Sequence, residues 1–191
     1  MWLKSVEGLE HVPTEGPCIL ASNHESYLDF IVLDAALPRV PVFLAGEVFY
    51  RNPLLAWAFD RMHFIRVDRD RAGNAAHLLG TAKSVLDDGG VVAMYPEGTR
   101  SLDGKLRKAH SGVGLLAHLS EVPVVPVAVR GTWEAWAKGT KRPKKAACSV
   151  HFGSRLVFSK AAYDADPSIV RDSTRQIMKA IAELADEEYP W

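Results

Sequence analysis

Short apolar runs, each about as long as one buried strand, recur along this chain and alternate with helical stretches. Three of these runs cover residues 18–21, 91–95 and 122–129. Residues 27–37 are helical in character, and residues 72–86 place their apolar side chains on one side of a helix. This alternation is typical of an α/β domain with a largely parallel central sheet flanked by helices. The length of 191 residues suits one hydrophobic core, so we expect a single domain over residues 1–191.

The remaining pattern adds further elements and an antiparallel end to this sheet. Two more strand-like runs and two more helices are expected at residues 40–45, 63–68, 54–62 and 112–119. Residues 146–152 and 155–158 are expected to form a closing hairpin. Asp166 and Pro167 predict the capped start of a final helix that runs to about residue 187. Pro123 and Pro126 cannot donate to a ladder, so we expect them at the start of their strand or on an edge.

The composition excludes several classes of protein. Lys and Arg number 23 against 23 Asp and Glu, so no overall field attracts nucleic acid and no nucleic-acid partner is expected. The chain shows no signal-peptide pattern and no apolar run of the ~18 to 20 residues that a membrane span needs. We therefore expect a cytoplasmic protein, attached at most to the inner face of a membrane. Cys18 and Cys148 are expected to be buried reduced thiols, and the spacing of the histidines indicates no metal site.

A histidine follows the first apolar run, and an aspartate follows that histidine five residues later. Neutral His24 could take a proton from an attacking hydroxyl, while Asp29 fixes its tautomer and stabilises the imidazolium. Five residues within one helix turn by about 500°, so this interpretation requires that His24 lie just outside the helix. An alternative stays open, because Ser26 and Asp29 also have the spacing of a capping box.

The same spacing occurs again at His63 and Asp68, but there it does not indicate a catalytic pair. Those two residues lie in a strand-like run, where an odd separation puts the side chains on opposite faces. No nucleophile is apparent beside His24, since Ser26 is better used as a cap. This favours direct attack by the hydroxyl of a substrate over a covalent enzyme intermediate.

A second candidate site, residues 96–101, comes directly after another buried strand, where α/β proteins bind ligands. Gly98 lets a ligand approach the backbone closely, and Thr99 offers a hydroxyl group. Arg100 offers a fork of donors for a phosphate or carboxylate. The alternative is a turn with a solvated arginine.

Four motifs in this chain resemble, in their order, those of the lysophosphatidic acid acyltransferase family, also called the glycerolphosphate acyltransferase superfamily. Residues 23–29 match the first motif at every defined position, and residues 67–69 resemble the second. Residues 95–101 match the third, with tyrosine for the usual phenylalanine, and residues 122–126 match the fourth. The resemblance extends from about residue 8 to the final helix.

The resemblance implies a glycerolphosphate acyltransferase-like fold and transfer of a fatty acyl group from an acyl thioester to a hydroxyl. By the same resemblance His24 is the general base and Asp29 its orienter. The residues expected to bind the acceptor or shape its site are Asn23, Ser26, Arg66, Arg69, Glu97, Gly98, Thr99, Arg100 and His110. Arg66 competes with Arg69 for the phosphate because the register of the second motif is loose. His110 stands where family members often carry a lysine, with Lys105, Arg107 and Lys108 as nearby substitutes.

The expected activity is O-acyl transfer to a lysophospholipid, with 1-acylglycerol-3-phosphate as acceptor and phosphatidic acid as product. Acyl-CoA or acyl-carrier protein is the expected co-substrate, and no cofactor is expected. Two alternatives remain open: another acceptor, such as a lyso-ornithine lipid, glycolipid or small alcohol, or a non-catalytic module that binds lipid or acyl-carrier protein. Family members often begin with a membrane-inserting segment, and this chain begins almost at the first motif. The basic loop at residues 131–145 suits a lipid headgroup region, the phosphates of CoA or an acidic carrier protein.

Overall fold

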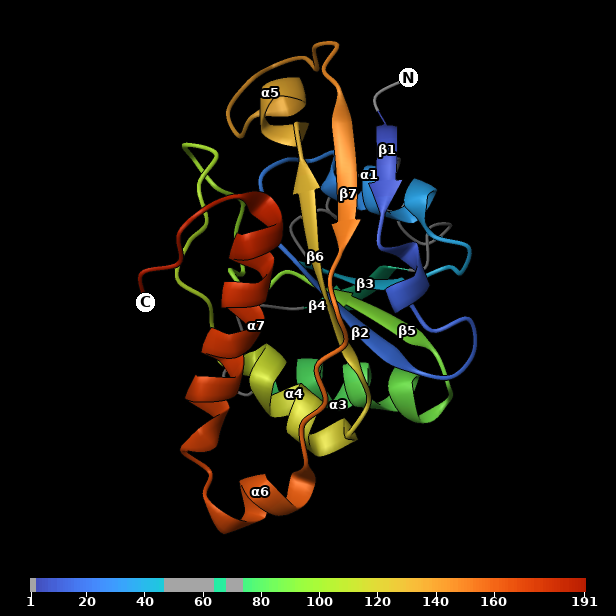
Figure 1. The fold of residues 1–191 in the computed structure, drawn as a ribbon, viewed down its shortest axis with the longest axis vertical. Coiled ribbons are helices and arrows are strands. Elements are labelled where there is room, and N and C mark those ends of the chain that lie inside the picture. Colours follow the sequence, from blue (N-terminus) through green and yellow to red (C-terminus); the bar gives the residue numbers. More distant parts are fainter. Residues whose placement is uncertain (1–2, 47–63, 68–73) are drawn as a thin grey trace.

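A computed structural model describes residues 3–46, 64–67 and 74–191 of the chain. The strands of these residues form one seven-stranded sheet in the order β1-β7-β6-β2-β5-β3-β4 (Figure 1). The bounds are β1 Leu3–Glu7, β2 Cys18–Ser22, β3 Val42–Gly46, β4 Phe64–Val67, β5 Val91–Met94, β6 Val124–Arg130 and β7 Cys148–Phe152. Five neighbouring strands, from β6 to β4, run parallel, and β7 runs antiparallel to β6. The expected α/β fold with a largely parallel sheet and an antiparallel end is thus confirmed.

Helices cover both faces of the sheet. Helix α1 (Asp29–Ala36) packs on one face, where Leu33 lies in a core cluster with Val125, Val127 and Val129 of β6. The opposite face carries α3 (Asn74–Asp87), α4 (Gly112–Ser120) and α7 (Ile169–Ala185). Figure 1 shows these three helices gathered away from α1. The split follows the alternation of side chains along the strands, which sends neighbouring residues into opposite cores.

Among the described residues there are also three short helices, η1 (Leu9–His11), α5 (Thr132–Trp136) and α6 (Lys160–Ala165). The final helix was predicted with Asp166 as its cap and Pro167 as its first residue, but α7 begins two residues later, at Ile169, and its N-cap residue is Ser168. The carboxylate of Asp166 accepts a hydrogen bond from the Ser168 N–H at 2.9 Å in the turn before the helix. Helix α5 occupies the start of the stretch that the sequence suggested was all loop. Strand β1 was not predicted, and it pairs in parallel with β7.

Two sequence predictions about the antiparallel end were wrong. Residues 146–152 and 155–158 form no hairpin, because the chain continues past β7 along β6 rather than turning back. The Gly153 N–H donates to the Pro126 carbonyl at 2.8 Å, and Leu156 forms an isolated bridge with Val124. Pro126 lies inside β6, between β2 and β7, and not on an edge. The ladder between β6 and β7 begins one residue later, at Val127, so the missing proline donor costs little at this place.

Some predictions fall outside the described residues: the helix at 54–62, and both His63 and Asp68. Cys18 and Cys148 are buried and form no disulfide, as expected. In the described ranges no helix has the length and apolar character to cross a bilayer. The same ranges contain no group of three or more His, Cys, Asp or Glu side chains arranged to hold a metal ion.

Candidate active site

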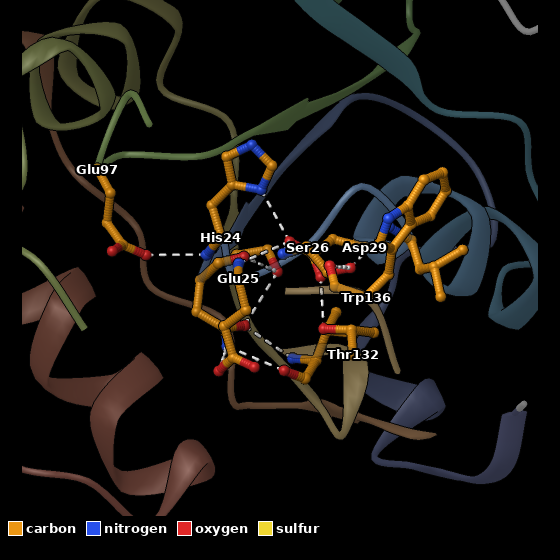
Figure 2. A network of polar contacts seen from close by, with 11 residues as sticks. His24, Glu25, Ser26, Asp29, Glu97, Thr132 and Trp136 are labelled. Atoms are coloured by element: carbon orange, nitrogen blue, oxygen red, sulfur yellow. Dashed lines mark hydrogen bonds and ion pairs between the residues drawn. The ribbon is translucent and has the colours of Figure 1, made fainter. Parts of the chain in front are cut away.

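The first motif spans the connection between β2 and α1, at the carboxyl edge of the parallel strands. Strand β2 ends at Ser22 and α1 begins at Asp29, so His24 lies outside the helix, as its pairing with Asp29 requires. Nδ1 of His24 lies 2.8 Å from Oδ2 of Asp29 (Figure 2). The His24 side chain is 20% exposed and that of Asp29 only 1%, so the imidazole reaches solvent from a buried carboxylate.

The carboxylate of Asp29 also holds the turn in which it lies. Oδ2 accepts hydrogen bonds from the backbone N–H groups of Glu25 at 2.7 Å and Ser26 at 2.9 Å. Oδ1 accepts from the hydroxyl of Thr132 at 2.6 Å (Figure 2). The contact to the Ser26 N–H and the contact to His24 therefore exist together in the geometry of Asp29, and its catalytic role stays a prediction.

The imidazole of His24 is held in one orientation by contacts on two sides. Asp29 binds Nδ1, and the ring of Tyr95 stacks on the imidazole at 4.1 Å between centroids and 18° between planes. With Nδ1–H donated to a carboxylate, the lone pair of the neutral ring lies on Nε2. No described residue forms a hydrogen bond with Nε2. Burial, with the charge of Asp29 as a second cause, raises the pKa of Tyr95 well above its usual value, so the hydroxyl beside His24 stays neutral.

The third motif braces the backbone of the first. Oε1 of Glu97 accepts from the His24 N–H, and Oε2 accepts from the Arg107 N–H, both at 2.8 Å. The Ser101 N–H donates to the His24 carbonyl at 2.7 Å. Burial raises the pKa of Glu97 to about 7, against the two backbone donors that lower it. Glu97 thus joins the loops after β2 and β5, and a direct contact with the acceptor stays a prediction.

Three further residues of the third motif, Gly98, Thr99 and Arg100, are partly exposed. Gly98 adopts φ +68°, and a Cβ atom there would come within 2.9 Å of the ring of His110, which is exposed. The hydroxyl of Thr99 accepts from Nζ of Lys138 at 3.3 Å. The guanidinium carbon of Arg100 lies 3.3 Å from the centroid of the Tyr27 ring. One Nη atom of Arg100 is buried without a hydrogen-bond partner in the described part of the chain.

Asn23 and Ser26 use their polar atoms within the protein. The amide of Asn23 bonds to both the N–H and the carbonyl of Val129, at 2.8 and 2.9 Å, and ties the end of β2 to β6. The hydroxyl of Ser26 donates to the Trp136 carbonyl at 2.7 Å. These contacts give both residues a bracing role, and substrate contacts by either remain predictions. The backbone of Arg66 lies in β4, whereas Arg69 falls outside the described residues.

Glu25 and Thr132 belong to this site, but no pattern in the sequence predicted them as site residues. Glu25 is 8% exposed, and its carboxyl accepts from the Asn23 amide at 2.8 Å. Burial, followed by the nearby charges of Asp29 and Glu187, raises the pKa of Glu25 to about 9, so Glu25 stays neutral at neutral pH. Thr132 follows Asp29 by 103 positions, so no local pattern links them. Only the pairing of β2 with β6 and the position of α5 bring Thr132 to the carboxylate.

The chain is similar to known acyltransferases in sequence. The family model described as Acyltransferase matches residues 4–130, which is well over half of the chain. A 1-acyl-sn-glycerol-3-phosphate acyltransferase of Limnanthes douglasii is 35% identical over 150 residues, covering 77% of this chain and 52% of that protein. The human 1-acyl-sn-glycerol-3-phosphate acyltransferase alpha is 30% identical over 148 residues, covering 76% and 52%. The chain therefore spans about half the length of the curated relatives it matches.

A solved structure has the same fold. The crystal structure of the 1-acyl-sn-glycerophosphate (LPA) acyltransferase PlsC from Thermotoga maritima matches with a TM-score of 0.74 and 21% identity. The match covers all of this chain and 74% of PlsC. At this identity the likeness concerns the fold, while the family is established by the sequence match over residues 4–130 and by the Limnanthes relative. On this evidence the chain belongs to the acyltransferase family.

Proposed function

We propose that this protein is an O-acyltransferase that moves a fatty acyl group from an acyl thioester to the hydroxyl of a lysophospholipid. The proposed acceptor is 1-acylglycerol-3-phosphate, which gives phosphatidic acid, and the donor is acyl-CoA or acyl-carrier protein. The observation that carries the proposal is the 2.8 Å contact between Nδ1 of His24, which lies outside the helix, and Asp29 at the start of α1, which leaves Nε2 on the far side of the ring from the carboxylate. The acceptor is suggested by the names of the relatives.

The chemistry needs only a base and a positioned hydroxyl, because a thioester is already activated. Nε2 of His24 takes the proton of the acceptor hydroxyl while the hydroxyl oxygen attacks the thioester carbonyl carbon. The new C–O ester bond forms, the C–S bond breaks, and the imidazolium returns the proton to the departing thiolate. Asp29 stabilises the imidazolium through Nδ1, and the Tyr95 ring keeps the imidazole in its plane.

Two cationic groups support a phosphate-bearing acceptor. Arg100 is packed on Tyr27 with one Nη unpaired by described residues, and Lys138 reaches Thr99 of the third motif. An Arg fork suits phosphate, and a lysine adds a point charge. We assign both to the acceptor headgroup.

Because α5 occupies the start of the predicted basic stretch 131–145, the basic loop proper is residues 137–145, and it supports a membrane surface as partner. It carries Lys138, Lys141, Arg142, Lys144 and Lys145, no acidic residue, and is exposed from residue 139 onward. The two tryptophans of α5 are only partly exposed and pack inward: Trp136 lies 5.2 Å from Tyr27, and Trp133 lies against Gly104. The lysines and arginine therefore supply the proposed contact with anionic headgroups, and the tryptophans do not.

The proposal is tested with purified protein, an acyl-CoA donor and a panel of lysolipid acceptors. His24→Ala is expected to lower transfer at least about a hundredfold, since general-base catalysis contributes about 10² to 10⁴. His77→Ala, at an exposed position of α3, is the matched control and should leave activity unchanged. Near-normal turnover of a folded His24→Ala protein would overturn the role of His24. If the wild type transfers acyl groups only to acceptors that carry no phosphate, the assignment of 1-acylglycerol-3-phosphate as acceptor is wrong.

A further inference from the structure

The short helix α5 contacts the first motif at two points, and one of them is the carboxylate of Asp29. The Thr132 hydroxyl, at the start of α5, donates to Oδ1 of Asp29 at 2.6 Å. At the other end of α5, the Trp136 carbonyl accepts from the hydroxyl of Ser26 at 2.7 Å. Ser26 also forms an isolated bridge with Ala137. Helix α5 therefore fixes the turn around His24 from outside the first motif.

The two oxygens of Asp29 receive different donors. Oδ2 accepts from Nδ1 of His24 and from the N–H groups of Glu25 and Ser26. Oδ1 accepts from Thr132, and no other described residue donates to it. Thr132 and Asp29 are both fully buried, so water cannot replace this donor at the surface. A carboxylate oxygen left there without a donor would favour rotation of the group or its protonation, and either change weakens the contact with Nδ1.

We propose that Thr132 is a positioning residue for the pair formed by His24 and Asp29. Its hydroxyl holds Oδ1, so that Oδ2 faces Nδ1 and the imidazole keeps Nε2 directed at the substrate. The effect on the pair follows from the contacts alone, while the effect on acyl transfer rests on the proposed function. Two readouts separate these claims.

The first readout is the rate of acyl transfer. Thr132→Val replaces the hydroxyl by a methyl group of similar size, and it is expected to lower kcat about 10- to 100-fold, as a misplaced catalytic group does. The KM for the acceptor should stay within about twofold, because the Thr132 hydroxyl, among the described residues, forms a hydrogen bond only with the carboxylate of Asp29. Thr132→Ser keeps the hydroxyl and should restore most of kcat. Thr14→Val is the matched control, since Thr14 is exposed and lies before β2, outside the first motif, α5 and the basic loop.

The second readout is the imidazole Nδ1–H proton of His24 in the NMR spectrum, which does not depend on catalysis. We expect a downfield signal in the wild type that is absent in His24→Ala, and we expect it to shift or broaden in Thr132→Val. Thr132→Ser should keep the signal, and Thr132→Ala serves if the valine variant does not fold. An unchanged signal and an unchanged kcat in a folded variant without the hydroxyl would overturn the proposal. A serine variant as poor as the valine variant would also overturn it, since packing of the methyl group would then explain the loss.

Discussion

Glu25 is a buried carboxyl group whose protonation couples stability to pH. Its pKa rises from 4.5 to about 9, mainly through burial and then through the charges of Asp29 and Glu187. Between these two values the folded protein keeps a proton that the unfolded chain releases. The unfolding free energy therefore falls as the pH rises through this range, by at most about 1.4 kcal/mol per pH unit from this group. Glu97, with a pKa of about 7, adds a loss of the same sign at the acidic end of the range.

Glu25→Gln is expected to flatten this dependence and to make the protein more stable at about pH 8, because glutamine is neutral in both states. The amide oxygen of glutamine can accept from Asn23 as the carboxyl does. Urea unfolding at about pH 5 and about pH 8 measures the change. Glu15→Gln, at an exposed position, is the control and should leave the slope as in the wild type. A variant with the wild-type slope would show that Glu25 titrates alike in both states.

Arg100 combines a guanidinium stacked on Tyr27 with a buried Nη atom that no described residue pairs, so replacing Arg100 should weaken binding of a phosphate-bearing acceptor. Arg100→Ala is expected to raise the KM for 1-acylglycerol-3-phosphate about tenfold or more, with a smaller change for an uncharged monoacylglycerol. Arg100→Lys keeps the charge but loses the fork and should recover the KM only in part. Steady-state kinetics with the two acceptors makes the comparison, with exposed Arg171→Ala as control. Equal increases for both acceptors would mean that Arg100 supports the loop instead of binding phosphate.

At the level of elements, Gly8 lies between β1 and η1, where the chain passes close to the end of β7. Gly8 has φ +71°, and a Cβ atom there would overlap the carbonyl oxygen of Phe152. Gly8→Ala is therefore expected to cost roughly 2 kcal/mol or more of unfolding free energy, since it combines backbone strain with a clash. Gly16→Ala has nearly the same φ, +74°, with nothing within 4 Å, and should cost about 1 kcal/mol. Urea unfolding of both variants separates the two causes, and equal losses would contradict the clash.

The elements that could be predicted are those whose signal is local. Continuous apolar runs predicted β2 and β5, and a one-sided apolar pattern predicted α3. Asp166 and Pro167 predicted the start of α7 to within two residues. Strand β1 was missed because its sequence is mixed and its partner, β7, lies about 140 residues later. The hairpin predicted over residues 146–152 and 155–158 rested on residues typical of a turn, but Leu156 pairs with Val124 at the start of β6 and not with β7. Pairing over long distances, and not local preference, decided each of these cases.

The same division applies to the site. His24 and Asp29 could be predicted because they lie five residues apart in one motif. The supports of this pair come from two other places: Tyr95 and Glu97 in the third motif, and Thr132 in α5. Asn23 and Ser26 were expected at the substrate, yet their polar atoms hold β6 and α5. The motifs thus identify the residues that build the site. The order of the strands decides whether a given side chain faces solvent or forms hydrogen bonds within the protein.

At the scale of the whole molecule, the balanced charge of 23 against 23 leaves no net attraction to an anionic surface, so the proposed attraction to a membrane would have to come from an uneven distribution of charge. The basic loop contributes five positive side chains. A neighbouring loop, residues 101–110, adds Lys105, Arg107 and Lys108 against one Asp, and exposes Leu102 by 63%. The contact of Trp133 with Gly104 connects the two loops through α5. Lys138 and Arg107 tie them to the third motif, so a surface bound there would lie next to His24.

Replacing Lys141, Arg142, Lys144 and Lys145 by alanine is therefore expected to weaken binding to vesicles of phosphatidylcholine and phosphatidylglycerol. Each basic side chain near an anionic surface contributes about 1 kcal/mol, so the four together should lower the partition coefficient at least about tenfold. Vesicle pelleting measures this, and added salt should reduce wild-type binding in the same direction. The matched control removes four positive charges elsewhere, at Lys160, Arg171, Arg175 and Lys179, all exposed on α6 and α7. Because both variants have the same net charge, equal binding by the two would show that total charge governs attachment and that the basic loop has no special part in it.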